Sequence, residues 1–281
     1  MIALLGGLGA ALCWAVSALC ASAASRAIGS ASTLAWVMAI GLLLIAIPIA
    51  LLAPVSQLTP RTVGLIALAG ATNVLGLLIE YVAFRRGKVG VISAIASTEG
   101  VIAAVIAVVL GAHLALGTAA VLVVVAAGVV AAAAHDDPAS AAADGVRSAV
   151  LAIPVALLFG VSLYATGHVG SEISVLWVLA PARLLGTVFL LAPLRLRGAL
   201  VLTVRALPLA GAAAAAEAVG IVSYELGARH GIAVAAVTAS QFAALATLGA
   251  FVVMRERLTR LQLIGLAVIA VGVGVLAAIQ A

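Results

Sequence analysis

A series of apolar runs, separated by short breaks, limits what this chain can fold into more than any other feature. The runs are roughly 20 residues long, and Pro, Gly, Arg or Asp interrupt them. A helix of about 20 residues spans the hydrocarbon core of a bilayer. Because that core offers no hydrogen-bond partners, a chain that crosses it must pair its backbone groups internally. The runs therefore predict transmembrane helices.

Composition favours the same reading. Only 8% of the 281 residues are charged, whereas 66% are hydrophobic. A soluble domain carries about 25% charged residues, so this chain has too few to cover a surface in water. The sequence thus predicts an all-α polytopic membrane protein in contact with the lipid bilayer.

Ten helices are expected. The first run resembles a secretion signal near its end, but it has no basic segment before it and further apolar runs follow at once, so we expect it to be retained. The expected helices are 3–24, 31–53, 63–85, 90–111, 117–134, 147–166, 172–192, 206–227, 231–253 and 259–280.

The two halves of the chain resemble each other in sequence. Residues 11–17 align with 156–162, and residues 81–98 align with 224–241, at a spacing that stays between 143 and 145 residues. A repeat with five helices makes the second copy enter the membrane from the opposite side. We therefore predict two inverted five-helix repeats, 1–134 and 147–281, joined by a polar linker at 135–146. This arrangement suits alternating access to a site near the midplane.

Lys and Arg are distributed unevenly among the predicted loops. Loops after odd-numbered helices hold 11 of them, and loops after even-numbered helices hold 2. The positive-inside rule then predicts that both termini lie outside a cell membrane, which we expect to be the plasma membrane. The formal charge of +5 is explained by these loops, so no nucleic-acid partner is expected.

The turn before the last predicted helix carries a family-like motif. Met254-Arg255-Glu256-Arg257-Leu258-Thr259 is followed by Gln262-Leu263-Ile264-Gly265. With this motif and layout, the chain resembles the EamA type of the drug/metabolite transporter superfamily, whose members commonly carry a Gly-Glu-Arg-Leu-Thr turn. The first half matches more weakly, since Ala112-His113-Leu114-Ala115 replaces Glu-Arg-Leu-Thr. The resemblance implies transport of small molecules and leaves the solute open.

A few polar side chains interrupt the apolar helices. Ionisable groups inside a membrane are costly and usually face a cavity or a partner. Glu99, Glu217 and Arg183 lie near the middle of their predicted helices. The candidate solute-binding residues, chosen for polarity or aromatic character and most of them at similar depth, are Trp14, Asn73, Tyr81, Glu99, Arg183, Glu217 and Gln241.

Each candidate has a functional and a structural interpretation. The planar guanidinium of Arg183 suits a solute carboxylate, but Arg183 could equally pair with a glutamate to hold helices together. Arg183 also matches an arginine often found in the second helix of a family repeat, where the first half has Met38. Glu99 or Glu217 would hold a solute amine or exchange a proton. Trp14 and Tyr81 would stack on an apolar or cationic group, although Trp14 could simply pack.

Three further glutamates are expected to have structural roles. Glu80 and Glu225 can reach the membrane interface or pair with Arg86 and Arg229. Glu256 can cap the start of the last helix.

We expect a secondary transporter that exports or exchanges small organic metabolites such as amino acids, with a proton as the possible coupling ion. No Gly-x-x-x-x-Gly-Lys-Ser/Thr run occurs, which argues against direct ATP coupling. No cofactor, metal site or catalytic group is expected. Gly265 and Gly272 share a face that could serve internal packing or a dimer, so the chain is expected to be a monomer or a weak homodimer.

Three other functions remain open at this point. One is efflux of drugs or organic cations through Glu99 and Glu217. Another is an enzyme acting on lipid, for which we find no nucleophile, base or metal cluster. The last is a receptor-like or structural membrane protein that transports nothing.

Overall fold

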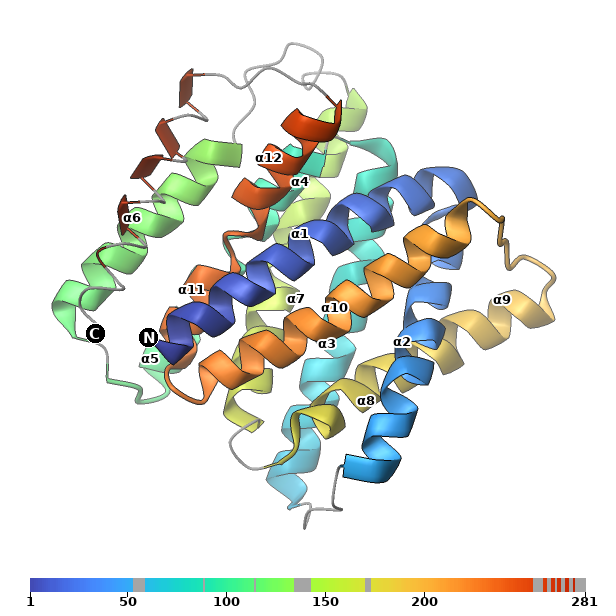
Figure 1. The fold of residues 1–281 in the computed structure, drawn as a ribbon, viewed down its shortest axis with the longest axis horizontal. Coiled ribbons are helices and arrows are strands. Elements are labelled where there is room, and N and C mark those ends of the chain that lie inside the picture. Colours follow the sequence, from blue (N-terminus) through green and yellow to red (C-terminus); the bar gives the residue numbers. More distant parts are fainter. Residues whose placement is uncertain are drawn as a thin grey trace.

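In the computed structural model, the chain forms a bundle of helices (Figure 1). The structure describes residues 1–52, 59–87, 89–113, 115–133, 143–169 and 173–254, with scattered positions from 260 to 275. Throughout this described part the regular elements are helices and there are no strands. Six helices of this described part are long and apolar enough to cross a membrane. The chain is therefore an all-helical, multi-pass membrane protein, as predicted.

The described elements follow the predicted order. The first half contains α1 (Ile2–Ile28), α2 (Ser30–Leu52), α3 (Pro60–Arg86), α4 (Val89–Ala96), α5 (Glu99–Val109) and α6 (Leu116–Ala133). The second half contains α7 (Ala143–Val169), α8 (Val175–Gly186), η2 (Thr187–Leu191), α9 (Ala192–Leu196), α10 (Ala206–Ala228), α11 (Ile232–Ala239) and α12 (Phe242–Met254).

Two predicted helices are broken in the middle. The run 90–111 is divided into α4 and α5 at residues 97–98, and the run 231–253 is divided into α11 and α12 at residues 240–241. At each break a hydroxyl donates to a carbonyl three residues earlier: Thr98 Oγ1 to Ile95 O at 2.8 Å, and Ser240 Oγ to Val237 O at 2.9 Å. Side-chain bonds of this kind compete with the helical backbone ladder. Hydropathy alone predicted continuous helices here, which was wrong.

The predicted helix 172–192 also differs from expectation. It begins at Val175, changes to a π-helical turn over Thr187–Leu191 and continues into α9. Near the change, Thr187 Oγ1 donates to Arg183 O at 2.7 Å. Isolated π turns in helices are often found at functional sites.

Some predictions fall outside the described residues. These are most of the linker 135–146, the turn 255–259 with Glu256, and nearly all of the tenth helix 259–280.

Helices α1 and α10 run side by side in opposite directions (Figure 1). Their contact is very close at one end, since a Cβ on Gly6 would lie 2.6 Å from Gly227 Cα. There Ser223 Oγ donates to Gly6 O at 2.9 Å. Small residues let membrane helices approach in this way, so the backbones of α1 and α10 contact each other directly.

Contacts between the halves occur in matched pairs. Helix α1 packs on α10 and α7 packs on α3, and these are the two most extensive pairings. In the same way, the contact of α5 with α7 corresponds to the contact of α12 with α1. The contact of α3 with α8 corresponds to the contact of α10 with α2. The centre of the molecule therefore lies between the two pairs α1–α10 and α3–α7.

Candidate functional site

A cavity lies at this centre, and its empty space together with the open solvent at its mouth amounts to about 760 Å³. Its walls come from α1, α3, α7, α8 and α10, together with the first residues of α5 and α12. Both halves of the chain thus contribute to it.

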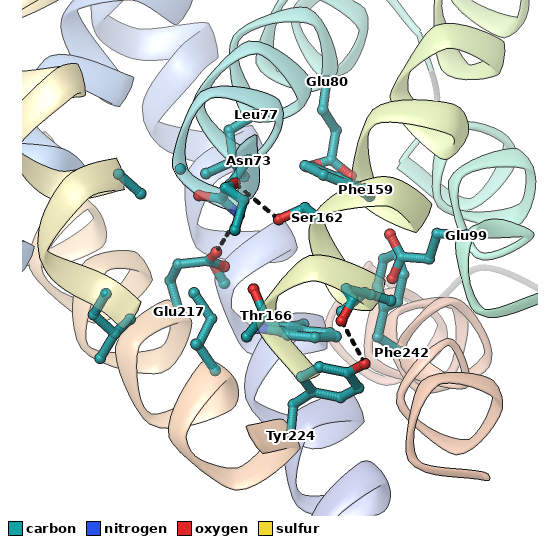
Figure 2. A pocket seen from close by; sticks show the side chains of 18 of the residues that line it. Asn73, Leu77, Glu80, Glu99, Phe159, Ser162, Thr166, Glu217, Tyr224 and Phe242 are labelled. Carbon is teal, nitrogen blue, oxygen red and sulfur yellow. Dashed lines mark hydrogen bonds between the residues drawn. The ribbon is translucent and has the colours of Figure 1, made fainter. Parts of the chain in front are cut away.

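Three carboxyl groups line the cavity: Glu80 on α3, Glu99 on α5 and Glu217 on α10. Each residue is 3–5% exposed. In the view of Figure 2, Glu217 lies on one side, Glu99 lies on the other, and Ser162 and Thr166 of α7 lie between them. The cavity wall therefore carries hydrogen-bond acceptors that water outside the protein barely reaches.

The broken helix positions Glu99. Because the chain turns at residues 97–98, Glu99 becomes the first residue of α5. The first turn of a helix has unpaired N–H groups and a partial positive charge, which favours an acidic side chain there. A Cβ on the next residue, Gly100, would lie 2.7 Å from Ser240 Oγ, so the two helix breaks pack directly against each other.

Glu217 is held by a neighbour from the other half. Asn73 Nδ2 donates to Glu217 Oε1 at 3.5 Å, linking α3 to α10 (Figure 2). The positive charge of Arg183 also acts on this carboxyl, although no ion pair joins the two at contact distance. Glu217 thus has a hydrogen-bond donor and a nearby opposite charge.

Aromatic rings form much of the remaining wall. Trp14 and Tyr224 lie with ring centroids 6.0 Å apart, and Phe159 and Phe242 line the same cavity. Two glycines make room for two of the rings, because a Cβ on Gly220 would collide with the Trp14 indole and a Cβ on Gly76 would collide with the Phe159 ring. The rings give the cavity apolar faces beside its carboxyls.

The two tyrosines on the wall differ in their hydrogen bonding. The Tyr224 hydroxyl donates to Leu163 O at 2.8 Å. The Tyr81 hydroxyl is buried and makes no close hydrogen bond, and Tyr81 is 1% exposed. The Ser17 hydroxyl, on the same cavity wall, is the polar side chain that interacts with it.

Five of the predicted site residues line this one cavity, and two do not. The five are Trp14, Asn73, Tyr81, Glu99 and Glu217. Gln241 lies in the turn between α11 and α12, 4% exposed, and its Nε2 is buried without a partner.

Arg183 lies beside the cavity and outside its lining. The residue is fully buried, and its Nη1 donates to Met38 Sδ at 3.4 Å. Its Nε and Nη2 have no hydrogen-bond partner. The side chain fits here because a Cβ on Gly41 would lie 2.9 Å from Arg183 Cδ, so the glycine leaves the space that the arginine fills.

Glu80 and Glu225 were predicted to reach the membrane interface or to pair with Arg86 and Arg229. This prediction is confirmed for Glu225 and was wrong for Glu80. Glu225 pairs with Arg229 at 2.7 Å. Glu80 lines the cavity instead of pairing with Arg86. The reason is helical geometry: six residues are about 1.7 turns, which places the two side chains on different faces of α3.

Four further lining residues were not predicted, although the sequence similarity between the two halves pairs each of these four with a residue of the first half, at spacings of 143 to 145 residues. Phe159, Ser162, Tyr224 and Phe242 correspond in this way to Trp14, Ser17, Tyr81 and Glu99.

The chemistry of the cavity suits reversible binding. Among the residues that the structure describes, no group of three or more His, Cys, Asp or Glu is arranged to hold a metal ion. Carboxyls, an amide, hydroxyls and aromatic faces surround the space. A concave, largely apolar site with a few polar groups is typical of small-molecule binding.

Fold and cavity together describe a multi-pass helical membrane protein with a partly polar cavity at its centre. The model of the EamA-like transporter family matches residues 1–133. Over these residues the chain is similar to this family, which is part of the drug/metabolite transporter superfamily, and the resemblance seen in the sequence is confirmed for that part of the chain. The family points to a membrane transporter of small molecules rather than to an enzyme.

A solved structure shares the fold over nearly the full length of the chain. A crystal structure of a protein that is 18% identical superposes with a TM-score of 0.75, covering 99% of this chain and 96% of the other. In all, 16 chains of solved structures match. No curated protein matches the chain.

Proposed function

We propose that this chain is a secondary transporter that exports or exchanges a small organic metabolite across the plasma membrane by alternating access. The observation that carries the proposal is the central cavity, whose walls come from both halves and which holds three carboxyl groups at the level of two broken helices. Broken helices that line a site between two halves are a recurring feature of secondary transporters.

The proposal includes an inverted repeat, and matched hydrogen bonds support it. Ser17 Oγ donates to Ala213 O at 3.3 Å, joining α1 to α10. Ser162 Oγ donates to Ala69 O at 3.1 Å, joining α7 to α3. The two serines are 145 residues apart and the two alanines 144, so exchanging the halves turns one bond into the other.

A second kind of contact indicates where the two-fold axis runs. Residues on such an axis meet their own counterparts. Met38 contacts Arg183, which is 145 residues away, and Asn73 contacts Glu217, which is 144 residues away. We infer an axis that passes between α2 and α8 and between α3 and α10, beside the cavity.

In this scheme the two halves rock about the cavity and expose it to one side of the membrane at a time. Glu99 and Glu217 are the groups we assign to solute binding and to a coupling proton, since membrane carboxyls commonly mark such paths. The Lys and Arg distribution favours both termini outside.

Solute flux into liposomes tests the proposal. Purified protein is reconstituted, loaded with one unlabelled solute at a time from amino acids, nucleosides, sugars and organic amines, and assayed for uptake of the same labelled solute. We expect protein-dependent counterflow of one chemical class, lost in Glu217→Gln. The control is Glu225→Gln, which changes a buried carboxyl outside the cavity wall. Ligand-dependent stabilisation without flux of any solute would instead favour a receptor-like protein.

A further inference from the structure

The charges around the cavity are unequal in sign. Three glutamates face it, and the described lining contains no Lys, Arg or His. Arg183 is the nearby cation, and it lies behind the wall with its Nη1 on Met38. The cavity region therefore has one basic side chain and three acidic side chains.

Of the three glutamates, Glu217 is the one on which the charge of Arg183 acts, and the same charge also acts on Tyr81. Asn73 donates a hydrogen bond to the Glu217 carboxyl. All of these groups come from α3, α8 and α10. The negative charge of the Glu217 carboxyl is thus balanced by groups of the protein itself.

Glu80 and Glu99 lack such compensation. Neither carboxyl makes a hydrogen bond or an ion pair with any residue that the structure describes, although the residues are 5% and 3% exposed. The charges that act on Glu99 are those of Glu80 and Glu217, which repel it. A buried carboxylate without a partner is strongly unfavourable, so each of these carboxyls is stabilised either by taking up a proton or by a cation that enters the cavity.

The surroundings of these two carboxyls suit an organic cation. Phe159 and Phe242 line the cavity with them, and Trp14 and Tyr224 form a further aromatic wall. Aromatic faces attract a cation and pack against its apolar body. A bare inorganic ion would use the carboxyls and leave the rings without a role.

We propose that the solute carries a protonated amine that binds between Glu99 and Glu80, with an aromatic or apolar body against the rings. The proposal rests on the transport function assigned above to this cavity. A carboxylate on the solute is not required, because Arg183 is not part of the cavity lining and its Nη1 donates to Met38 Sδ. Amines should therefore bind better than amino acids of the same shape, and carboxylic acids worst.

Three compounds of one shape test this prediction: phenethylamine, phenylalanine and phenylacetate. Binding to the detergent-purified protein is measured by titration calorimetry and by the rise in melting temperature. We expect phenethylamine to bind tightest. Glu99→Gln or Glu80→Gln should weaken phenethylamine binding about tenfold or more, because a charge contact to the amine is lost. Glu99→Asp, which keeps the charge, should restore part of the affinity.

Two comparisons make the test specific. Glu217→Gln should weaken binding less than Glu99→Gln does, because Arg183 and Asn73 already compensate Glu217. Glu225→Gln should leave the Kd unchanged, since Glu225 pairs with Arg229 and does not line the cavity. Should Glu99→Gln fail to fold, Glu80→Gln and Glu99→Asp test the same carboxyl pair.

Several outcomes would overturn the amine site. They are tighter binding of phenylacetate or phenylalanine, a larger effect of Glu217→Gln than of Glu99→Gln, or binding of none of the three compounds. Flux measured in parallel separates this proposal from the transport function. Counterflow of phenylalanine or phenylacetate alone would keep the transporter and reject the amine site, whereas phenethylamine binding that depends on Glu99, without flux, would keep the site and reject transport.

Discussion

Asn73 Nδ2 donates to Glu217 Oε1 at 3.5 Å, and the two residues are 144 positions apart. The same spacing relates Ala69 to Ala213 and Gly76 to Gly220, which take part in matched contacts with α7 and α1. The contact therefore joins α3 to α10 at the point where the two halves meet. It also gives the amide a specific role, which is to donate to a carboxyl whose other favourable interaction is with the charge of Arg183.

Asn73→Leu should lower stability through this contact. The substitution removes the donor, and because the bond is long at 3.5 Å we expect it to contribute about 0.5–1.5 kcal/mol, the range of an ordinary hydrogen bond. The melting temperature of the purified protein should fall, and the fall should be smaller when Glu217→Gln is already present. Fully additive effects in this double-mutant cycle would mean that the two side chains are not coupled.

Gly220→Ala should close part of the cavity. A Cβ there collides with the Trp14 indole, which forms one aromatic wall. We expect a shift in tryptophan fluorescence and weaker solute binding by about tenfold, as a displaced ring costs packing and contact area. The matched control is Gly211→Ala on the same helix, where a Cβ meets nothing within 4 Å. Equal effects of the two variants would contradict the role given to Trp14.

Gly41→Ala tests the placement of Arg183. The new Cβ would lie 2.9 Å from Arg183 Cδ and 3.0 Å from its Nε, so the guanidinium must move away from Met38. We expect a fall of several degrees in melting temperature, because strain in a packed site costs about 1–3 kcal/mol. Gly64→Ala, with nothing within 4 Å, should leave the melting temperature nearly unchanged. If Gly41→Ala melts like Gly64→Ala, the arginine is not confined as described.

Much of the fold follows from hydropathy, because a bilayer requires each long apolar run to be a helix. The broken helices could not be found this way, since hydropathy averages over residues 97–98 and 240–241. Residues 97–98 and 240–241 nevertheless correspond to each other when the two halves are aligned. Internal similarity thus pointed to positions where the apolar pattern showed nothing unusual.

The sequence was sufficient to predict those candidate site residues whose position depends on polarity alone. Glu99 and Glu217 line the cavity because charges avoid lipid. Arg183 also avoids lipid, yet it lies behind the wall, because Gly41 and Met38 on α2 provide another buried space. A buried charged side chain can lie either at the cavity wall or in the space beside Gly41 and Met38. Packing between helices that are distant in the sequence determines which of these two positions it occupies. Composition and spacing along the chain do not contain that information.

Accessibility of the cavity from the two sides of the membrane tests the central claim most directly. Thr166→Cys, on the cavity wall, is placed in a chain whose two cysteines, Cys13 and Cys20, are changed to alanine. Right-side-out and inside-out vesicles are then treated with a membrane-impermeant thiol reagent, and Leu12→Cys serves as control because Leu12 is 59% exposed on the outer surface of α1. Alternating access predicts labelling of Thr166→Cys from both sides, changed in opposite directions by a transported solute, with Leu12→Cys unlabelled. Labelling from one side only, whatever solute is present, would contradict the account.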